Sequence, residues 1–283
     1  MIPLMLDQLL QALCPRAVGD DAFVAHNMHP TSPRVYGGQV LAQALRAAAA
    51  TVGPERAVHS QHAYFLRPGD PAEDIRLEVD RALDGGSLSS RRVVALQRGK
   101  PILVSSVSFQ REGRGDEFQQ PLPPVPMPDN LPSERERALA EGLMDESFMV
   151  TTGLELDVRL VNPVDWQNPK PLPPHLEAWV KTTGPVPEGQ ALHASLLAYM
   201  SDILMIDVCL AATGRSFLLD DCQIASLDHA LWFHNPIKAD DWLLHTVEAE
   251  RVSGGRGLAR GKFYNAEGVL VASVVQQGLM RLR

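Results

Sequence analysis

An internal repeat is the strongest constraint on how this chain of 283 residues can fold. Residues 65–108 can be laid over residues 233–276 at a constant offset of 168, without a gap. Identical residues then coincide at turn positions as well as in apolar stretches. The pairs are Phe65 and Phe233, Pro68 and Pro236, Val79 and Val247, Gly86 and Gly254, Arg92 and Arg260, Ser105 and Ser273, and Val107 and Val275. A duplicated domain is the economical explanation of such self-similarity.

Each copy combines one helical stretch with a run of strands. Helices are predicted at residues 39–51 and at about 193–209, and the first follows Gly37-Gly38 and is rich in good helix formers. Alternating or β-branched segments predict strands at 58–66, 75–84, 87–98 and 101–110, and at 222–234, 242–252, 256–265 and 269–280. Turn residues at 84–86, 98–100, 253–255 and 265–268 predict hairpins between them. The pattern indicates an α+β fold in which each antiparallel sheet wraps a long helix.

The segment between the copies is rich in proline. Residues 121–132 contain six prolines, which predicts an extended linker. Ser133 and Glu136 have the spacing of a capping box, so a short helix is expected over residues 133–149. A second proline cluster at 169–174 precedes a predicted strand at 177–183. We therefore expect an N-terminal domain over 1–120, a linker and short helix over 121–150, and a C-terminal domain over 151–283.

Charge and cysteine content narrow the class of protein. A net charge of −8 argues against non-specific nucleic-acid binding, which depends on Lys and Arg. Cys14, Cys209 and Cys222 match neither a metal site nor a disulfide framework, and they fit a reducing cytoplasm. Residues 1–13 predict an amphipathic helix rather than a signal peptide, and no run approaches the ~20 apolar residues of a membrane span. We expect a cytoplasmic globular protein with neither nucleic acid nor membrane as partner.

Four separated segments resemble a known family. They are VYGGQV (35–40), VHSQHAYFLRPGD (58–70), SLDHALWFH (226–234) and GVLVASVVQQG (268–278). In this order they resemble the start of the first helix, a strand of the first copy, the central strand and the final strand of the acyl-CoA thioesterase II family. The resemblance covers residues from about 21 to 281. It implies a tandem, or double, hot-dog fold and hydrolysis of fatty acyl-CoA without metal or organic cofactor. It also implies a homo-oligomer, a dimer or tetramer of chains.

The resemblance also assigns three catalytic residues. It places the catalytic acid of the family on Asp202, its catalytic amide on Gln276, and a hydroxyl on Ser226, where the family commonly has Thr. Thioester hydrolysis needs a positioned water, a base and donors for the oxyanion, and a covalent nucleophile is not obligatory. A carboxylate among apolar neighbours could deprotonate water, and an amide could hold it. Without the resemblance, Asp202 could equally be a solvent-facing helix carboxylate, and the other two ordinary strand residues.

The repeat then distinguishes the two copies. At the offset of 168, Gln276 aligns with Ser108 and Ser226 aligns with Val58. We therefore expect the first copy to be structural or substrate-shaping and the second copy to carry catalysis. Backbone N–H groups at a helix N-terminus are the expected oxyanion donors. The candidates are Gly37-Gly38 and their counterpart before Ser201.

Two other functions stay open at the level of sequence. A hot-dog hydratase or dehydratase would need a histidine paired with a carboxylate. We interpret four histidines of the predicted strands as structural, because no motif pairs them with a carboxylate; they are His59, His62, His229 and His234. A non-catalytic acyl-CoA-binding module would bind acyl-CoA without turnover. The presence of all three water-holding residues in the second copy favours the hydrolase.

Overall fold

The computed structural model describes residues 2–28, 32–142, 155–219 and 222–282. The strands of these residues form one antiparallel sheet in the order β1-β2-β4-β5-β6-β3-β9-β12-β11-β10-β8-β7. The first half supplies β1 (Arg16–Gly19), β2 (Ala22–Ala25), β3 (Arg56–Phe65), β4 (Ile75–Asp84), β5 (Leu88–Gln97) and β6 (Lys100–Arg111). The second half supplies β7 (Leu156–Leu160), β8 (His175–Thr182), β9 (Cys222–Phe233), β10 (Leu243–Ser253), β11 (Arg256–Asn265) and β12 (Leu270–Leu282).

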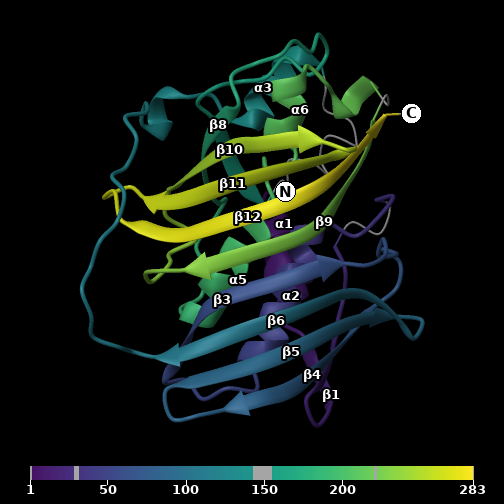
Figure 1. Ribbon diagram of the computed structural model, residues 1–283, viewed down its shortest axis with the longest axis vertical. Coiled ribbons are helices and arrows are strands. Elements are labelled where there is room, and N and C mark those ends of the chain that lie inside the picture. The colour runs from purple at the N-terminus through teal and green to yellow at the C-terminus, as the bar shows by residue number, and fades with distance from the viewer. Residues whose placement is uncertain (1, 29–31, 143–154, 220–221, 283) are drawn as a thin grey trace.

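The two copies join edge to edge at the middle of this sheet. Strands β3 and β9 pair antiparallel, and His62 lies opposite Ala230. These two residues occupy the same position in the repeat, so a pseudo-two-fold axis passes between them. Figure 1 shows the blue strands of the first copy below and the yellow-green strands of the second copy above, with β3 beside β9. The expected duplication is therefore a single continuous sheet rather than two separate ones.

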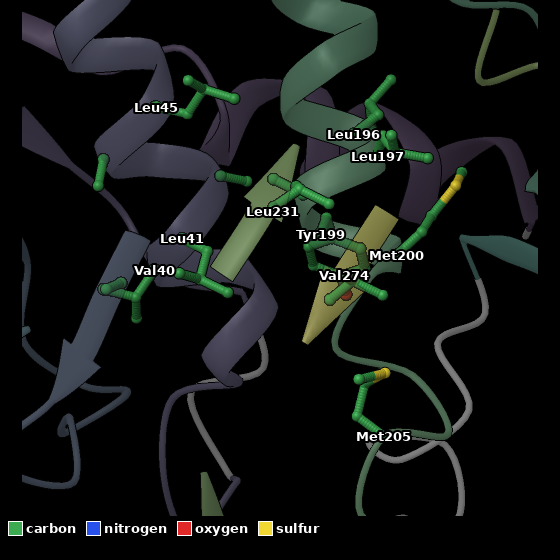
Figure 2. Packing of buried hydrophobic residues seen from close by; sticks show 14 of the residues in the cluster. Val40, Leu41, Leu45, Leu196, Leu197, Tyr199, Met200, Met205, Leu231 and Val274 are labelled. Atoms are coloured by element: carbon green, nitrogen blue, oxygen red, sulfur yellow. The ribbon is translucent and has the colours of Figure 1, made fainter. Parts of the chain in front are cut away.

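One face of the sheet is covered by helices α1 (Ile2–Ala12), α2 (Gly37–Ala49), α5 (Gln190–Met200) and α6 (Asp207–Thr213). A further helix, α3 (Glu134–Glu141), contacts β7. The 3₁₀ turn η1 (Pro128–Asn130) lies in the linker, and η2 (Phe217–Leu219) comes shortly before β9. Helices α2 and α5 lie side by side, and Figure 2 shows Leu41 and Leu45 on α2, Leu196 and Leu197 on α5, and Leu231 of β9 beside Leu41. Their apolar faces and the inner side chains Leu231 and Val274 belong to one buried cluster that includes both copies. None of the helices in the described residues is long and apolar enough to cross a bilayer.

The proline-rich linker lies along the opposite face of the sheet. Three linker side chains, Leu122, Val125 and Leu131, pack against an outward-facing cluster of Trp179, Leu244 and Tyr264. The Trp179 indole N–H donates to the Pro126 carbonyl at 2.8 Å. Extended backbone suits this contact because proline fixes φ and needs no donor partner. The predicted capping box of α3 is confirmed: Glu136 N–H donates to Ser133 Oγ, and the Glu136 carboxylate accepts from Ser133 N–H. Helix α3 ends before Gly142, and residues 143–149 of the predicted helix lie outside the described residues.

The gapless repeat is wrong in its last strand. Gln61 of β3 lies opposite Val107 of β6, whereas His229 of β9 lies opposite Gln276 of β12. Gln61 and His229 are 168 residues apart, but Val107 and Gln276 are 169 apart. The connection at 266–269 is longer than its counterpart at 98–99, and this shifts β12 by one residue. The structural counterpart of Gln276 is therefore Val107, not Ser108.

The long helix expected at 193–209 is also wrong. Helix α5 ends at Met200, α6 begins at Asp207, and the residues between them form turns. Leu204 lies in the left-handed region with φ of 66°. This conformation, unusual for a branched residue, interrupts the helical path without any glycine or proline to announce it.

Candidate active site

Asp202, Ser226 and Gln276 come together in the second copy. Ser226 is in β9, Gln276 is in the neighbouring strand β12, and Asp202 is in the turn that follows α5. The Ser226 hydroxyl donates to Asp202 Oδ1 at 3.3 Å, and the Gln276 amide nitrogen donates to Ser226 Oγ at 3.1 Å. The three side chains that the resemblance singled out are thus connected by hydrogen bonds.

The first copy holds the other oxygen of the carboxylate. Gly38 N–H, in the first turn of α2, donates to Asp202 Oδ2 at 2.9 Å. The N-terminus of a helix carries a partial positive charge, which favours a carboxylate at that position. Asp202 is therefore placed at the end of a helix of the first copy, and not within a helix of its own as the sequence predicted.

Two glycines make this approach possible. A Cβ atom on Gly37 would lie 2.7 Å from Asp202 Oδ2, and one on Gly38 would lie 2.4 Å from the Tyr199 carbonyl oxygen. The close approach of α2 to the end of α5 therefore requires glycine at position 38, whereas a methyl group at position 37 would displace the Asp202 carboxylate. Because the Gly38 N–H is bound to Asp202, the carboxylate already uses this donor of the helix terminus. The second expected oxyanion donor is wrong, since the residues before Ser201 form the C-terminus of α5.

Gln276 is anchored from behind by a histidine. Both side chains are 1% exposed, and His229 Nδ1 lies 2.5 Å from Gln276 Oε1. His229 Nε2 lies 2.9 Å from the hydroxyl of Ser201, which is also buried. One N–H of the Gln276 amide is used by Ser226, which leaves the second as a donor for a water. Gln276 therefore reaches Asp202 through Ser226 rather than directly.

The sequence interpretation missed this position of His229. It treated His229 like the other strand histidines, which do have the expected structural contacts: His59 with Ser108, His62 with the Trp232 ring, and His234 with Ser273. Only the register that places His229 opposite Gln276 on the inner face distinguishes it. His229 contacts an amide and a hydroxyl, and it lies buried behind Gln276.

Burial sets the protonation states around the site. Loss of solvent lowers the pKa of His229, an effect that the nearby Asp202 charge opposes, so its imidazole is neutral at pH 7. Burial, together with the Asp202 charge, raises the pKa of Asp207 to about 6. Burial also raises the pKa of Tyr36 and Tyr199 well above the ordinary tyrosine value. The carboxylate of Asp202 thus has neutral neighbours in these two tyrosines and His229.

The corresponding positions of the first copy are apolar. Val58 takes the place of Ser226, and Val107 takes the place of Gln276. Gln61 stands where the second copy has His229, and its amide donates to the Leu41 carbonyl at 3.0 Å. The hydrogen-bonded chain is therefore built in the second copy, with one donor from the first. Among the described residues, no group of His, Cys, Asp and Glu side chains is arranged to hold a metal ion.

Comparisons with known proteins decide the family. Residues 24–110 match the family model described as the acyl-CoA thioesterase N-terminal domain, and residues 162–279 match the model described as acyl-CoA thioesterase. The chain is 34% identical over 282 residues to acyl-CoA thioesterase 2 of Haemophilus influenzae, with 98% of each chain covered. The chain belongs to the acyl-CoA thioesterase II family.

Solved structures support the same family assignment. An acyl-CoA thioesterase II from Mycobacterium marinum is 34% identical, with a TM-score of 0.79 over 97% of this chain and 98% of that one. A protein with a hot-dog fold from Alicyclobacillus acidocaldarius is 18% identical, with a TM-score of 0.77 over 98% of both chains, and it shows the fold alone. The expected double hot-dog fold and the expected enzyme class, a thioester hydrolase, are confirmed.

Proposed function

We propose that this thioesterase hydrolyses fatty acyl-CoA to free fatty acid and CoA by direct attack of a water held by Asp202, Ser226 and Gln276. The observation that carries the proposal is the chain of hydrogen bonds from Gln276 through Ser226 to Asp202. A carboxylate held by two donors, next to an amide with a spare N–H, is an arrangement that can orient and deprotonate one water. The names of the relatives support acyl-CoA as the substrate.

In the proposed mechanism Asp202 is the general base. Ser226 and Gly38 each occupy one lone pair of the carboxylate, which leaves further lone pairs to accept a hydrogen bond from water. The water oxygen attacks the thioester carbonyl carbon while its proton passes to Asp202. The C–S bond then breaks, and the sulfur leaves with the electron pair and takes the proton that Asp202 received. General base catalysis of this kind contributes about 10²- to 10⁴-fold in rate.

Substitution of the base tests the proposal. Purified protein is incubated with acyl-CoA esters of short, medium and long chain, and thiol release is followed. Asp202→Asn keeps the size of the side chain and removes the base, so we expect kcat to fall by about 10²-fold or more. Asp241→Asn is the matched control, because Asp241 is an exposed carboxylate paired with Lys238.

Three outcomes decide between the functions. Thiol release that collapses in Asp202→Asn, with an unchanged circular dichroism spectrum, supports the hydrolase and its base. Saturable acyl-CoA binding without thiol release from any ester overturns the hydrolase in favour of a binding module. Release that survives in Asp202→Asn keeps the activity and refutes the assigned base.

A further inference from the structure

The chain of hydrogen bonds continues beyond the three proposed catalytic residues into the core. Gln276 Oε1 contacts His229 Nδ1 at 2.5 Å, and His229 Nε2 contacts Ser201 Oγ at 2.9 Å. Ser201 is 0% exposed and His229 is 1% exposed. Hydrogen bonds connect both side chains to Ser226 and Asp202 through Gln276.

Such a chain can run in only two directions. A neutral imidazole donates from one nitrogen and accepts at the other, a hydroxyl has one hydrogen, and the two ends of an amide differ. In the forward direction Ser201 donates to His229 Nε2, and His229 Nδ1–H donates to Gln276 Oε1. Gln276 then donates to Ser226, and Ser226 donates to the carboxylate of Asp202.

In the reverse direction every one of these hydrogens changes sides. The Ser201 hydroxyl donates to the Ala198 carbonyl, which also lies 2.9 Å away. His229 then carries its proton on Nε2, Gln276 turns its amide nitrogen towards His229, and Ser226 donates to Gln276. No hydrogen remains between Ser226 Oγ and Asp202 Oδ1, although these oxygens are 3.3 Å apart.

The charge of Asp202 favours the forward direction. It places a hydroxyl hydrogen on a carboxylate, and such charge-assisted bonds are about twice as strong as neutral ones. The reverse direction gains only a neutral hydrogen bond to the Ala198 carbonyl. It also leaves Ser226 Oγ and Asp202 Oδ1 in contact without a hydrogen between them. Burial keeps the imidazole neutral, as its lowered pKa indicates, so one nitrogen of His229 must act as an acceptor.

We propose that His229 is a positioning residue that holds this chain in the forward direction. With its proton on Nδ1 and the Ser201 hydroxyl donating to Nε2, His229 holds Gln276 with its NH₂ group towards Ser226 and the water. Reversal would remove the Ser226 hydrogen from Asp202 and the amide donor from the water. The catalytic part of this inference rests on the proposed function, whereas the protonation state of His229 does not.

The first test reads the tautomer of His229 without any assay of activity. Protein labelled with ¹⁵N at histidine gives imidazole nitrogen shifts that distinguish the two tautomers, and His229→Asn identifies the signals. The expected result at pH 7 is a proton on Nδ1 in the wild type. A proton on Nε2 in the wild type overturns the proposal. Because no turnover is measured, this result is independent of whether the chain is a thioesterase.

The second test compares two substitutions of His229. The amide nitrogen of Asn can take the place of Nδ1 and donate to Gln276 Oε1, whereas Leu fills the space without a donor. We expect His229→Asn to keep kcat within several-fold and His229→Leu to lower kcat about 10²-fold, the scale of a misplaced catalytic group. KM should change little in both. His234→Leu is the control, because His234 directly follows β9, is exposed and is bonded to Ser273.

Equal losses in the Asn and Leu variants, with both folded, would refute the positioning role, as would full activity in His229→Leu. If His229→Leu does not fold, the tautomer of the wild-type protein and the activity of His229→Asn decide the question. If the wild-type protein releases no thiol from any ester but carries its His229 proton on Nδ1, the proposed function is overturned and the proposed direction of the chain stands.

Discussion

At the scale of single residues, the site depends on how closely a backbone can approach a carboxylate. A methyl group on Gly37 would lie 2.7 Å from Asp202 Oδ2 and 3.2 Å from the Phe65 ring, so the carboxylate must move. We predict that Gly37→Ala lowers kcat by about 10- to 100-fold and lowers the free energy of unfolding by about 1 to 3 kcal/mol. Thiol release and urea unfolding measure the two effects.

The matched control for this prediction is Gly86→Ala. A methyl group there would meet no atom within 4 Å, and the residue does not have a positive φ. The control should retain both activity and stability. Full activity in Gly37→Ala would contradict the proposed role of Asp202, because the carboxylate would then tolerate displacement.

At this scale the sequence predicts which side chains come together better than it predicts how they are arranged. The resemblance singled out Asp202, Ser226 and Gln276, and the structure brings them together. The role of His229 could not be predicted, because it depends on a register that differs by one residue from the gapless repeat. The contact of Gly38 with Asp202 joins residues 164 positions apart, and no local pattern encodes it.

At the scale of elements, the alternation of apolar and polar side chains predicted the longer strands well. The bounds of β4 and β11 match the predicted ranges, since both strands are bounded by clear turn residues. The short strands β1, β2 and β7 were missed, because four or five residues give too little alternation to recognise. The break between α5 and α6 was missed as well, since its left-handed residue is Leu204 rather than a glycine.

That break places a second carboxylate, Asp207, at the first residue of α6. Burial, and next the charge of Asp202, raise its pKa from an ordinary value of 3.8 to about 6. A raised carboxyl pKa means that ionisation opposes folding. Asp207 therefore costs no stability below about pH 4, where its carboxyl group is protonated in both the folded and the unfolded state. As the pH rises through about 6, its ionisation lowers the free energy of unfolding.

Asp207→Asn removes this charge and nearly preserves the shape of the side chain. We predict that the variant is more stable than the wild type by about 1 to 3 kcal/mol above pH 7, and by little at pH 4. Urea unfolding of both proteins at pH 4, 6 and 7.5 measures the difference. Asp241→Asn, an exposed carboxylate of the same copy, should show no such dependence. A stability difference that is the same at every pH would contradict the raised pKa.

At the scale of the whole molecule, the two copies share their sheet, their core and their site. β3 pairs with β9, α2 packs on α5, and one buried cluster includes residues of both halves. The repeat in the sequence predicted two domains, at 1–120 and 151–283, because self-similarity marks the unit of duplication. It could not predict how far the units fuse, since fusion depends on pairing between strands far apart in the chain.

This sharing predicts one cooperative unfolding transition. All four tryptophans lie in the second half, at positions 166, 179, 232 and 242, so tryptophan fluorescence reports mainly on that copy, with Trp232 also in contact with His62 of the first. Far-UV circular dichroism reports both copies. We expect the two signals to give the same urea midpoint, as a single cooperative unit requires.

A substitution that creates a cavity in the core of the first copy makes the test decisive. Leu103 of β6 is 0% exposed and lies far along the chain from every tryptophan. Leu103→Ala should cost about 2 to 5 kcal/mol and should lower the fluorescence midpoint as much as the circular dichroism midpoint. Leu139→Ala, at a site that is 58% exposed on α3, serves as the control without a shift. If Leu103→Ala lowered the circular dichroism midpoint and left the fluorescence midpoint unchanged, the copies would unfold independently. The shared sheet would then position Gly38 against Asp202 without coupling the stabilities of the two copies.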